Sequence, residues 1–314
     1  MLESPHKPSV VGGAMYCLVS ALAYTLSNIC MRELSVLRCD VVWAVFNREA
    51  ITALMLAPWV LRMAVRGQKG LPSGRGFWEL LAAGFQLQLV GNMCSQWAFG
   101  VVGLSVTIPV YFGAVIVCGA ILGRLWLDER VSQRSMAAML VLVIALTLLG
   151  QGAETAGKAI ASAGAGTLLL AVLAAGVSGT SSGLLAIAVR RSVQRAIAPV
   201  AIGFWIPFTG ALALGPLCLS RLGIAGILDT PSEQARLMLG AGGLNLIGFL
   251  SFIRGLQHIT VVRANLVNAS QVAMAAVAGM LIFREPPNFW LLAGIVLTIV
   301  GILQVGNPSN HEGF

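Results

Sequence analysis

Long stretches of this 314-residue sequence carry no charged side chain. No Asp, Glu, Lys or Arg occurs between Lys7 and Arg32, and none occurs from Leu80 to Gly123. Further charge-free stretches lie at 135–153, 159–189, 196–220, 237–253, 264–283 and 286–311. Charged residues make up only 10% of the chain, whereas roughly a quarter is usual in a soluble protein. Because a helix needs about 20 apolar residues to cross a bilayer, these stretches predict membrane spans.

Helices are the predicted structure of these spans. In lipid every backbone amide must be satisfied internally, which only helices and closed barrels achieve. Barrel strands alternate apolar and polar residues, but the stretches here are apolar on all sides. The Leu80–Gly123 stretch is long enough for two crossings that fold back at Val101-Val102-Gly103. We predict an all-α integral membrane protein with ten transmembrane helices near 10–30, 41–64, 77–99, 104–125, 135–152, 165–189, 199–220, 237–256, 262–283 and 288–306.

The net charge of +8 is distributed so that it orients the chain. With the N-terminus inside, the larger group of basic residues lies on the inner side: Lys7, Arg62, Arg66, Lys69, Arg75, Arg124, Arg130, Arg134, Arg190, Arg191, Arg195, Arg254 and Arg263. The outer side holds Arg32, Arg38, Lys158, Arg221, Arg236 and Arg284. Cytoplasmic loops carry the excess of Lys and Arg, so we predict a multi-pass protein of the plasma (inner) membrane with both termini cytoplasmic. No basic stripe with interleaved aromatic residues occurs, so nucleic acid is not an expected partner.

The two halves of the chain resemble each other. The segment from Gly100 to Glu129 has a counterpart from Gly255 to Glu285, with the glycines 155 residues apart. Because five spans is an odd number, consecutive five-helix repeats must enter the membrane from opposite sides. We predict two inverted five-helix repeats around a central cavity, with domains at 1–155 and 156–314. This arrangement is typical of transporters whose site lies where the repeats meet.

At these residues the chain resembles the ten-helix branch of the drug/metabolite transporter superfamily, which has two EamA repeats. The family pattern is a small-residue segment opening the fourth and ninth helices, an apolar run, a terminal Leu-Gly-Glu and a glycine-punctuated next helix. Ser105–Glu129 and Thr260–Glu285 carry that pattern, with Asp128 and Arg284 in place of its glycine. Arg48 matches an arginine that is common early in the second helix. The resemblance implies secondary transport of small metabolites, often outward, without ATP.

Polar side chains lie at helical spacing in two predicted spans. Gln88, Asn92 and Gln96 fall at i, i+4 and i+8, and Asn265, Asn268 and Gln271 are spaced by three. Polar groups in a span face the bundle or a wet cavity, so we predict a solute path, with hydrogen bonding between helices as the alternative. The predicted substrate-binding residues are Asn28, Arg48, Gln88, Asn92, Gln96, Tyr111, Asn245, Asn265, Asn268 and Gln271.

Arg48 and Glu49 are adjacent charges inside the second predicted span. They lie about seven residues, or roughly 10 Å, from its outer end. Adjacent helical residues do not face each other, so we expect that each needs a partner on another helix, or water. In one interpretation Arg48 binds an anionic group such as a carboxylate, and Glu49 is a proton-coupling candidate. In the other, Arg48 extends to the outer headgroups.

The expected function is transport of a small polar or amphipathic metabolite, for example an amino-acid-like one, by alternating access and with export as the expected direction. A proton or solute gradient is the expected driving force. A passive channel or facilitator and a non-transport membrane scaffold stay open as alternatives. Gly176-Val177-Ser178-Gly179 resembles the Gly-x-Ser-Gly of rhomboid proteases, but a serine nucleophile needs a nearby base. The histidines are His6, His258 and His311. His258 is expected near the inner end of the span at 237–256, whereas Ser178 is mid-span, so no enzyme is expected.

No cofactor or metal ion is expected. The six cysteines form no CxxC pair, and clustered His or carboxylate ligands, which a metal site needs, are missing from the sequence. The expected partners are a small-molecule substrate and membrane lipid, with the protein as a monomer or homodimer.

The charge asymmetry predicts which loops face the cytoplasm. Ser73 lies in the loop at 66–76, predicted inside, and Ala161 in a loop predicted outside. In a cysteine-free background, a membrane-impermeant thiol reagent added from outside should label Ala161→Cys and spare Ser73→Cys, because only the outer loop is reachable. Labelling of the Ser73 variant alone would invert the orientation.

Overall fold

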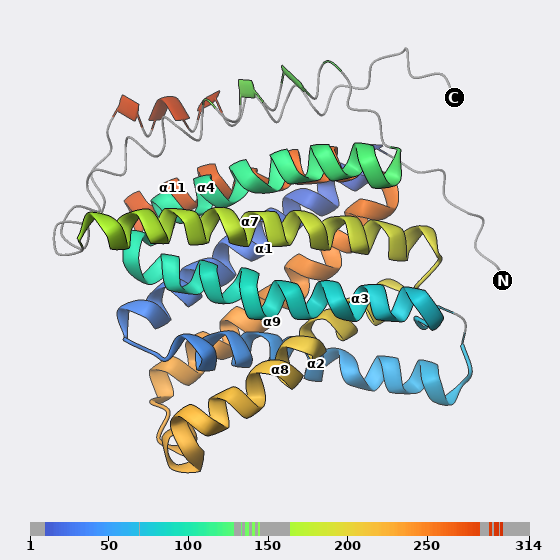
Figure 1. The fold of residues 1–314 in the computed structure, drawn as a ribbon, viewed down its shortest axis with the longest axis horizontal. Coiled ribbons are helices and arrows are strands. Elements are labelled where there is room, and N and C mark those ends of the chain that lie inside the picture. Colours follow the sequence, from blue (N-terminus) through green and yellow to red (C-terminus); the bar gives the residue numbers. More distant parts are fainter. Residues whose placement is uncertain are drawn as a thin grey trace.

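The computed structural model describes residues 10–68, 70–128 and 164–282, with scattered positions between 133 and 144 and between 289 and 297. The helices are long rods, some lying side by side and others crossing them at a slant (Figure 1). They are α1 (Val10–Val36), α2 (Val41–Val65), α3 (Gly74–Gln86), the π-helix η1 (Leu87–Asn92), α4 (Met93–Leu127), α7 (Ala165–Gln194), α8 (Pro199–Leu228), α9 (Ser232–His258), α10 (Val261–Asn268) and α11 (Ser270–Leu281).

Seven helices of the described part are long and apolar enough to cross a membrane. They span Val10–Val36, Val41–Val65, Val106–Leu127, Gly166–Gln194, Pro199–Leu228, Ser232–His258 and Val261–Ala278. The prediction of an all-helical membrane protein is thereby confirmed for these residues. The count of ten spans stays a prediction, because those expected at 135–152 and 288–306 lie largely outside the described residues.

The long apolar stretch from Leu80 to Gly123 folds back where the sequence predicts. Within α4, Gly103 has φ 72° and ψ −178°, which breaks the helix before the span at Val106–Leu127. Glycine adopts a positive φ without the steric cost that a side chain brings. Residues before the break continue α3 and η1 without a turn, since Leu87 and Met93 both have helical dihedrals. The predicted fold-back at Val101-Val102-Gly103 is therefore confirmed, and Val106–Leu127 after it is long and apolar enough to span. That both arms cross the membrane stays a prediction.

The span predicted at 262–283 is not one unbroken helix. α10 ends at Asn268 and α11 begins at Ser270, with Ala269 in a turn between them. Thr260 caps the start of α10 by accepting a hydrogen bond from the Arg263 amide at 3.4 Å. The interruption is slight, since Ala269 has φ −65° and ψ −10° and its amide still donates to the Asn265 carbonyl at 2.9 Å.

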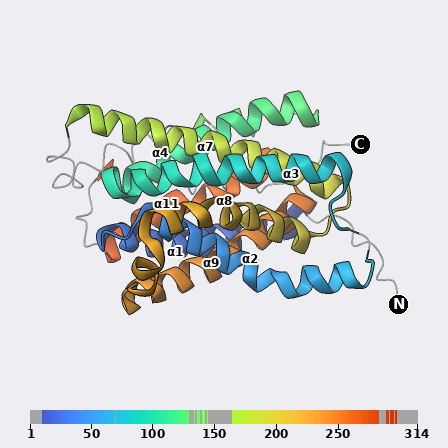
Figure 2. The ribbon, with the colours of Figure 1, turned by 60° about the horizontal axis from the view of Figure 1, so that its bottom comes forward.

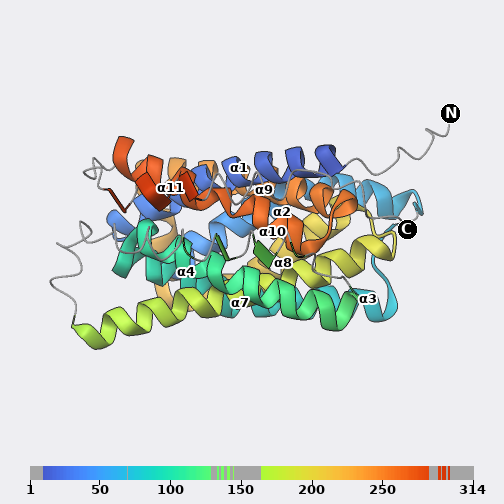
Figure 3. The same cartoon turned by 90° about the horizontal axis from the view of Figure 1, so that it is seen from above.

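The two halves of the chain interleave. α1 packs along α9, α4 along α7 and α2 along α8, so the main neighbour of each long helix comes from the other half. In Figure 2, α3, α4 and α7 form a layer that covers α1, α2 and α9. Seen from above, α1, α9 and α11 lie together on the face opposite α7 (Figure 3). This exchange of partners is consistent with two related repeats.

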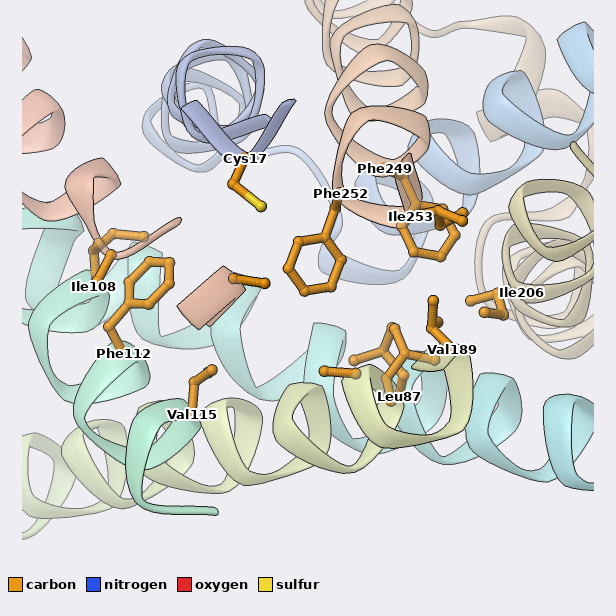
Figure 4. Packing of buried hydrophobic residues seen from close by; sticks show 14 of the residues in the cluster. Cys17, Leu87, Ile108, Phe112, Val115, Val189, Ile206, Phe249, Phe252 and Ile253 are labelled. Carbon is orange, nitrogen blue, oxygen red and sulfur yellow. The ribbon is translucent and has the colours of Figure 1, made fainter. Parts of the chain in front are cut away.

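The buried core runs between these layers. Phe112, Ile187, Ile206 and Leu256 are almost wholly buried. In Figure 4, the ring of Phe252 projects from α9 into the middle of this cluster. Large apolar side chains also point outward, among them Leu54, Leu61, Val65, Leu169 and Leu239. Outward apolar side chains suit contact with lipid tails, because a spanning helix meets no water there.

The close contact of α4 with α7 predicts a steric clash. A Cβ at Gly179 would lie 2.1 Å from the Tyr111 carbonyl oxygen, whereas a Cβ at Gly176 would meet nothing within 4 Å. Gly179→Ala should lower the free energy of unfolding by about 1–3 kcal/mol, the usual effect of overpacking. Gly176→Ala on the same helix is the matched control and should be neutral or slightly stabilising. Thermal unfolding in detergent measures both, and equal melting temperatures would show that the two helices separate readily here.

Candidate functional site

A cavity of about 130 Å³ lies at the centre of the bundle. Its lining comes from α1, α2, η1, α4 and α7 to α11, and therefore from both halves of the chain. The lining residues are Tyr24, Asn28, Arg48, Glu49, Leu87, Gln88, Asn92, Ser95, Phe99, Thr107, Ile108, Tyr111, Phe112, Val115, Ser182, Leu185, Ile206, Asn245, Phe249, Phe252, Asn265, Asn268 and Gln271. The cavity thus combines charges, amides and aromatic rings within the apolar bundle.

Arg48 and Glu49 form a buried ion pair in the wall of this cavity. Nη2 of Arg48 lies 2.7 Å from Oε1 of Glu49, and Nε donates to the same oxygen at 2.9 Å. Arg48 is 8% exposed and Glu49 3% exposed. The expectation that the two adjacent residues do not meet is therefore wrong, because the long arginine side chain bends back across the angle between neighbouring positions. The expected partners on another helix are present for Glu49. Arg48 also does not extend to the headgroups.

Two amides of η1 complete the surroundings of Glu49. Gln88 Nε2 donates to Oε2 at 3.0 Å, and Asn92 Nδ2 donates to Oε1 at 3.4 Å. Asn92 also donates to the amide oxygen of Gln88. Hydrogen bonds to a carboxylate are stronger than those between neutral groups, so the charge of Glu49 holds η1 against α2.

A second contact fixes the backbone of Arg48. Thr52 Oγ1 lies 2.9 Å from the Arg48 carbonyl oxygen and 3.0 Å from that of Gly242 on α9. Asn245 Nδ2 donates to the same hydroxyl at 3.1 Å. α2 is therefore held by polar contacts to η1 on one side and to α9 on the other.

The wall formed by α10 and α11 has unpartnered polar atoms. Among the described lining residues, Asn265 Nδ2 and Asn268 Oδ1 are buried without a hydrogen-bond partner, and so is Ser270 Oγ beside the cavity lining. Gln271 accepts only a long hydrogen bond, 3.5 Å, from Asn28 on α1. A buried polar group without a partner costs about 1–3 kcal/mol. This wall is consequently the part of the cavity that gains most from a polar ligand or from a change of conformation.

The structure brings together most of the predicted site residues. Asn28, Arg48, Glu49, Gln88, Asn92, Tyr111, Asn245, Asn265, Asn268 and Gln271 all line the cavity. Gln96 does not, since its Nε2 donates to the Met31 carbonyl at 3.0 Å and to Ser35 Oγ at 2.9 Å, both on α1. Its placement fits the alternative of hydrogen bonding between helices.

Other lining residues were missed by sequence reasoning. Ser95 is a lone hydroxyl within a span, and Ser182 ends the run Thr180-Ser181-Ser182, so neither gives more than a weak signal. Phe99, Phe112, Phe249 and Phe252 give none, because nothing in an apolar run separates a ring facing a cavity from one facing lipid. No group of three or more His, Cys, Asp or Glu that could hold a metal ion occurs among the described residues.

The ion pair predicts an unusual pattern of stabilities. Arg48→Gln and Glu49→Gln each leave one buried charge unpaired, which costs about 3–5 kcal/mol in the interior of a protein. The double variant removes both charges and should unfold at a higher temperature than either single variant. Thermal unfolding of all four proteins in detergent completes this double-mutant cycle. Additive losses would mean that the two side chains do not interact.

Comparison with known proteins agrees with this architecture. Residues 11–151 and 169–306 match the model of the EamA-like transporter family. A solved structure described as "Crystal structure of protein" shares the fold with a TM-score of 0.67 and 15% identity, over 93% of this chain and 95% of that chain. Comparison with curated protein sequences finds no match. The two family matches cover most of the sequence, and the chain belongs to the EamA-like transporter family, within the drug/metabolite transporter superfamily.

Proposed function

We propose that this protein is a secondary transporter that moves a small polar or amphipathic metabolite across the membrane by alternating access. Membership of the family implies a membrane transporter. The observation that carries the finer proposal is the central cavity, where the ion pair of Arg48 and Glu49 meets amides from the second half of the chain.

The free-energy cost of burying polar side chains within the membrane supports a solute-binding site at the cavity. Charged and amide side chains inside a membrane protein are expensive and usually face a pathway or a binding site. Packing alone does not require them here, since the unpartnered atoms of Asn265 and Asn268 gain nothing from the present arrangement. A passing polar solute offers these atoms hydrogen bonds, so the cavity is the proposed substrate site.

Two sets of contacts join the halves at opposite ends of the bundle. At one end, Arg195 Nη1 of α7 lies 2.6 Å from Glu79 Oε2 of α3. At the other, Arg221 Nη2 of α8 lies 2.9 Å from Asp40 Oδ2, and Trp43 Nε1 donates to Thr230 Oγ1 at 3.1 Å. These ends lie at opposite sides of Figure 1, at the α2–α3 and α1–α2 connections.

Both ion pairs are partly exposed to solvent, and pairs of this kind contribute little stability. They can therefore break and form again at low cost. We propose that the two halves of the chain rock against each other around the cavity, which stays fixed. In each state the contacts at one end of the bundle are broken while those at the opposite end remain formed.

Export, a proton or solute gradient as the driving force and cytoplasmic termini are parts of the same proposal. They rest on the resemblance and on the charge asymmetry of the loops. The proposed assembly is a monomer or homodimer, since each chain holds a complete cavity of its own.

Transport should depend on Arg48. A screen of labelled metabolites in proteoliposomes, with and without an imposed pH gradient, should identify a solute whose uptake saturates. Arg48→Ala should abolish that uptake, because it removes the cation of the cavity wall. Arg62→Ala is the matched control, since Arg62 is an exposed arginine on the same helix, outside the cavity lining and outside both sets of end contacts.

The amount of folded protein in the membrane must be equal for all variants. Normal uptake by Arg48→Ala would remove Arg48 from the proposed site. A flux that does not saturate with solute concentration and does not change with an imposed pH gradient would instead favour a passive channel.

A further inference from the structure

Resting on the transport function proposed above, we infer that the cavity binds a small monoanion together with one proton. Glu49 takes up the proton from water, and the anionic group of the substrate replaces Glu49 on the guanidinium of Arg48.

The first support is that Arg48 is already occupied. Its Nε and Nη2 both contact Oε1 of Glu49, at 2.9 Å and 2.7 Å. Glu49 thus takes one bidentate edge of the guanidinium, which has five N–H groups in all. A second carboxylate on Arg48 would have to share its one positive charge with ionised Glu49, and protonation of Glu49 removes this competitor.

The second support is the charge of the cavity. Among the described lining residues, the charged side chains are Arg48 and Glu49, and the other titratable ones are the phenols Tyr24 on α1 and Tyr111 on α4. η1, α9, α10 and α11 contribute amides and apolar groups, and α7 and α8 contribute Ser182, Leu185 and Ile206. The wall is thus neutral when empty.

A monoanion bound beside ionised Glu49 would leave one uncompensated negative charge in an apolar bundle, which is strongly disfavoured. With Glu49 protonated, the anion and Arg48 again sum to zero. The empty cavity and the cavity loaded with both proton and anion are therefore both neutral, so no net charge crosses with the substrate.

The third support separates a monoanion from a zwitterion, whose ammonium group would have to pair with Glu49. Oε1 already accepts from Arg48 and Asn92, and Oε2 accepts from Gln88. Even after Arg48 has turned to the substrate, Gln88 and Asn92 remain on the two oxygens of Glu49, which is only 3% exposed. An ammonium group would have to displace these amides. A proton needs no such room, and the amide that faces the carbonyl oxygen of the neutral acid can still donate to it.

Cavity size limits the apolar part of the substrate. The cavity has a volume of about 130 Å³, and an engineered apolar cavity of about 150 Å³ holds benzene. Phe112, Phe249 and Phe252 line the cavity, which suits a body of one ring. Benzoate is therefore a suitable probe, with phenylglycine as its zwitterionic counterpart and benzylamine as its cationic counterpart.

Titration calorimetry of the full chain in detergent tests the inference. Repeating each titration in buffers of different ionisation enthalpy gives the number of protons bound with the ligand. Benzoate should bind with uptake of one proton, and its affinity should rise up to about tenfold for each unit of falling pH while Glu49 is ionised in the free protein. Tighter binding of phenylglycine without a proton, or no binding of benzoate at acidic pH, would overturn the inference.

Variants assign the proton to its residue. Glu49→Gln resembles the neutral acid, so it should bind benzoate with no proton uptake and equally at every pH. The double variant Arg48→Gln/Glu49→Gln, which leaves no buried charge, should bind no benzoate. Asn47→Ala is the control: Asn47 donates to the Trp43 carbonyl at 2.9 Å on the same helix, outside the cavity lining, and should keep the uptake of one proton.

Proton uptake that persists in Glu49→Gln would show that another group titrates. If Glu49→Gln fails to fold, the proton count of the unmodified chain still decides whether a monoanion binds with a proton. A metabolite screen that finds saturable uptake, while benzoate fails to bind with a proton, would leave the transport function standing and overturn only this inference. Proton-linked binding of benzoate, with no metabolite transported in the screen, would overturn the transport function and leave this inference standing.

Discussion

The arrangement of the helices around the ion pair of Arg48 and Glu49 depends on satisfying these two buried charges. Moving two charges out of water raises the free energy by more than their mutual attraction lowers it, unless further hydrogen bonds satisfy them. Gln88 and Asn92 supply these bonds to Glu49, and Thr52 ties the Arg48 carbonyl region to α9. The need to satisfy one charged pair thus fixes three helices in register and leaves the cavity between them.

The fold follows largely from the distribution of charge along the chain. Charge-free stretches place the helices, and the fold-back at Gly103 follows from the length of the Leu80–Gly123 stretch together with a glycine at the turn. The break at Ala269 could not be predicted. Residues 261–278 contain neither proline nor glycine, and Asn268 and Ser270, which flank Ala269, give only a weak local signal for a turn.

The site was predictable in its residue types but not in its contacts. Spacing along a helix places Gln88, Asn92 and Gln96 near one face, yet only their neighbours decide which of them meets a cavity and which meets α1. The rule that adjacent helical residues do not meet holds for Cβ directions. It failed for Arg48 because a side chain with several rotatable bonds can turn its guanidinium toward Glu49.

The interleaving of the halves has a consequence for how the chain is made. α1 has its main neighbour in α9, which begins only at Ser232. At about 5–20 residues per second, ribosomes need roughly 10 to 45 seconds to reach it. The Arg48, Glu49, Gln88 and Asn92 cluster, however, is encoded entirely within the first half. The most expensive polar groups can therefore satisfy one another as soon as η1 has entered the membrane, while the nascent chain still lacks its second half.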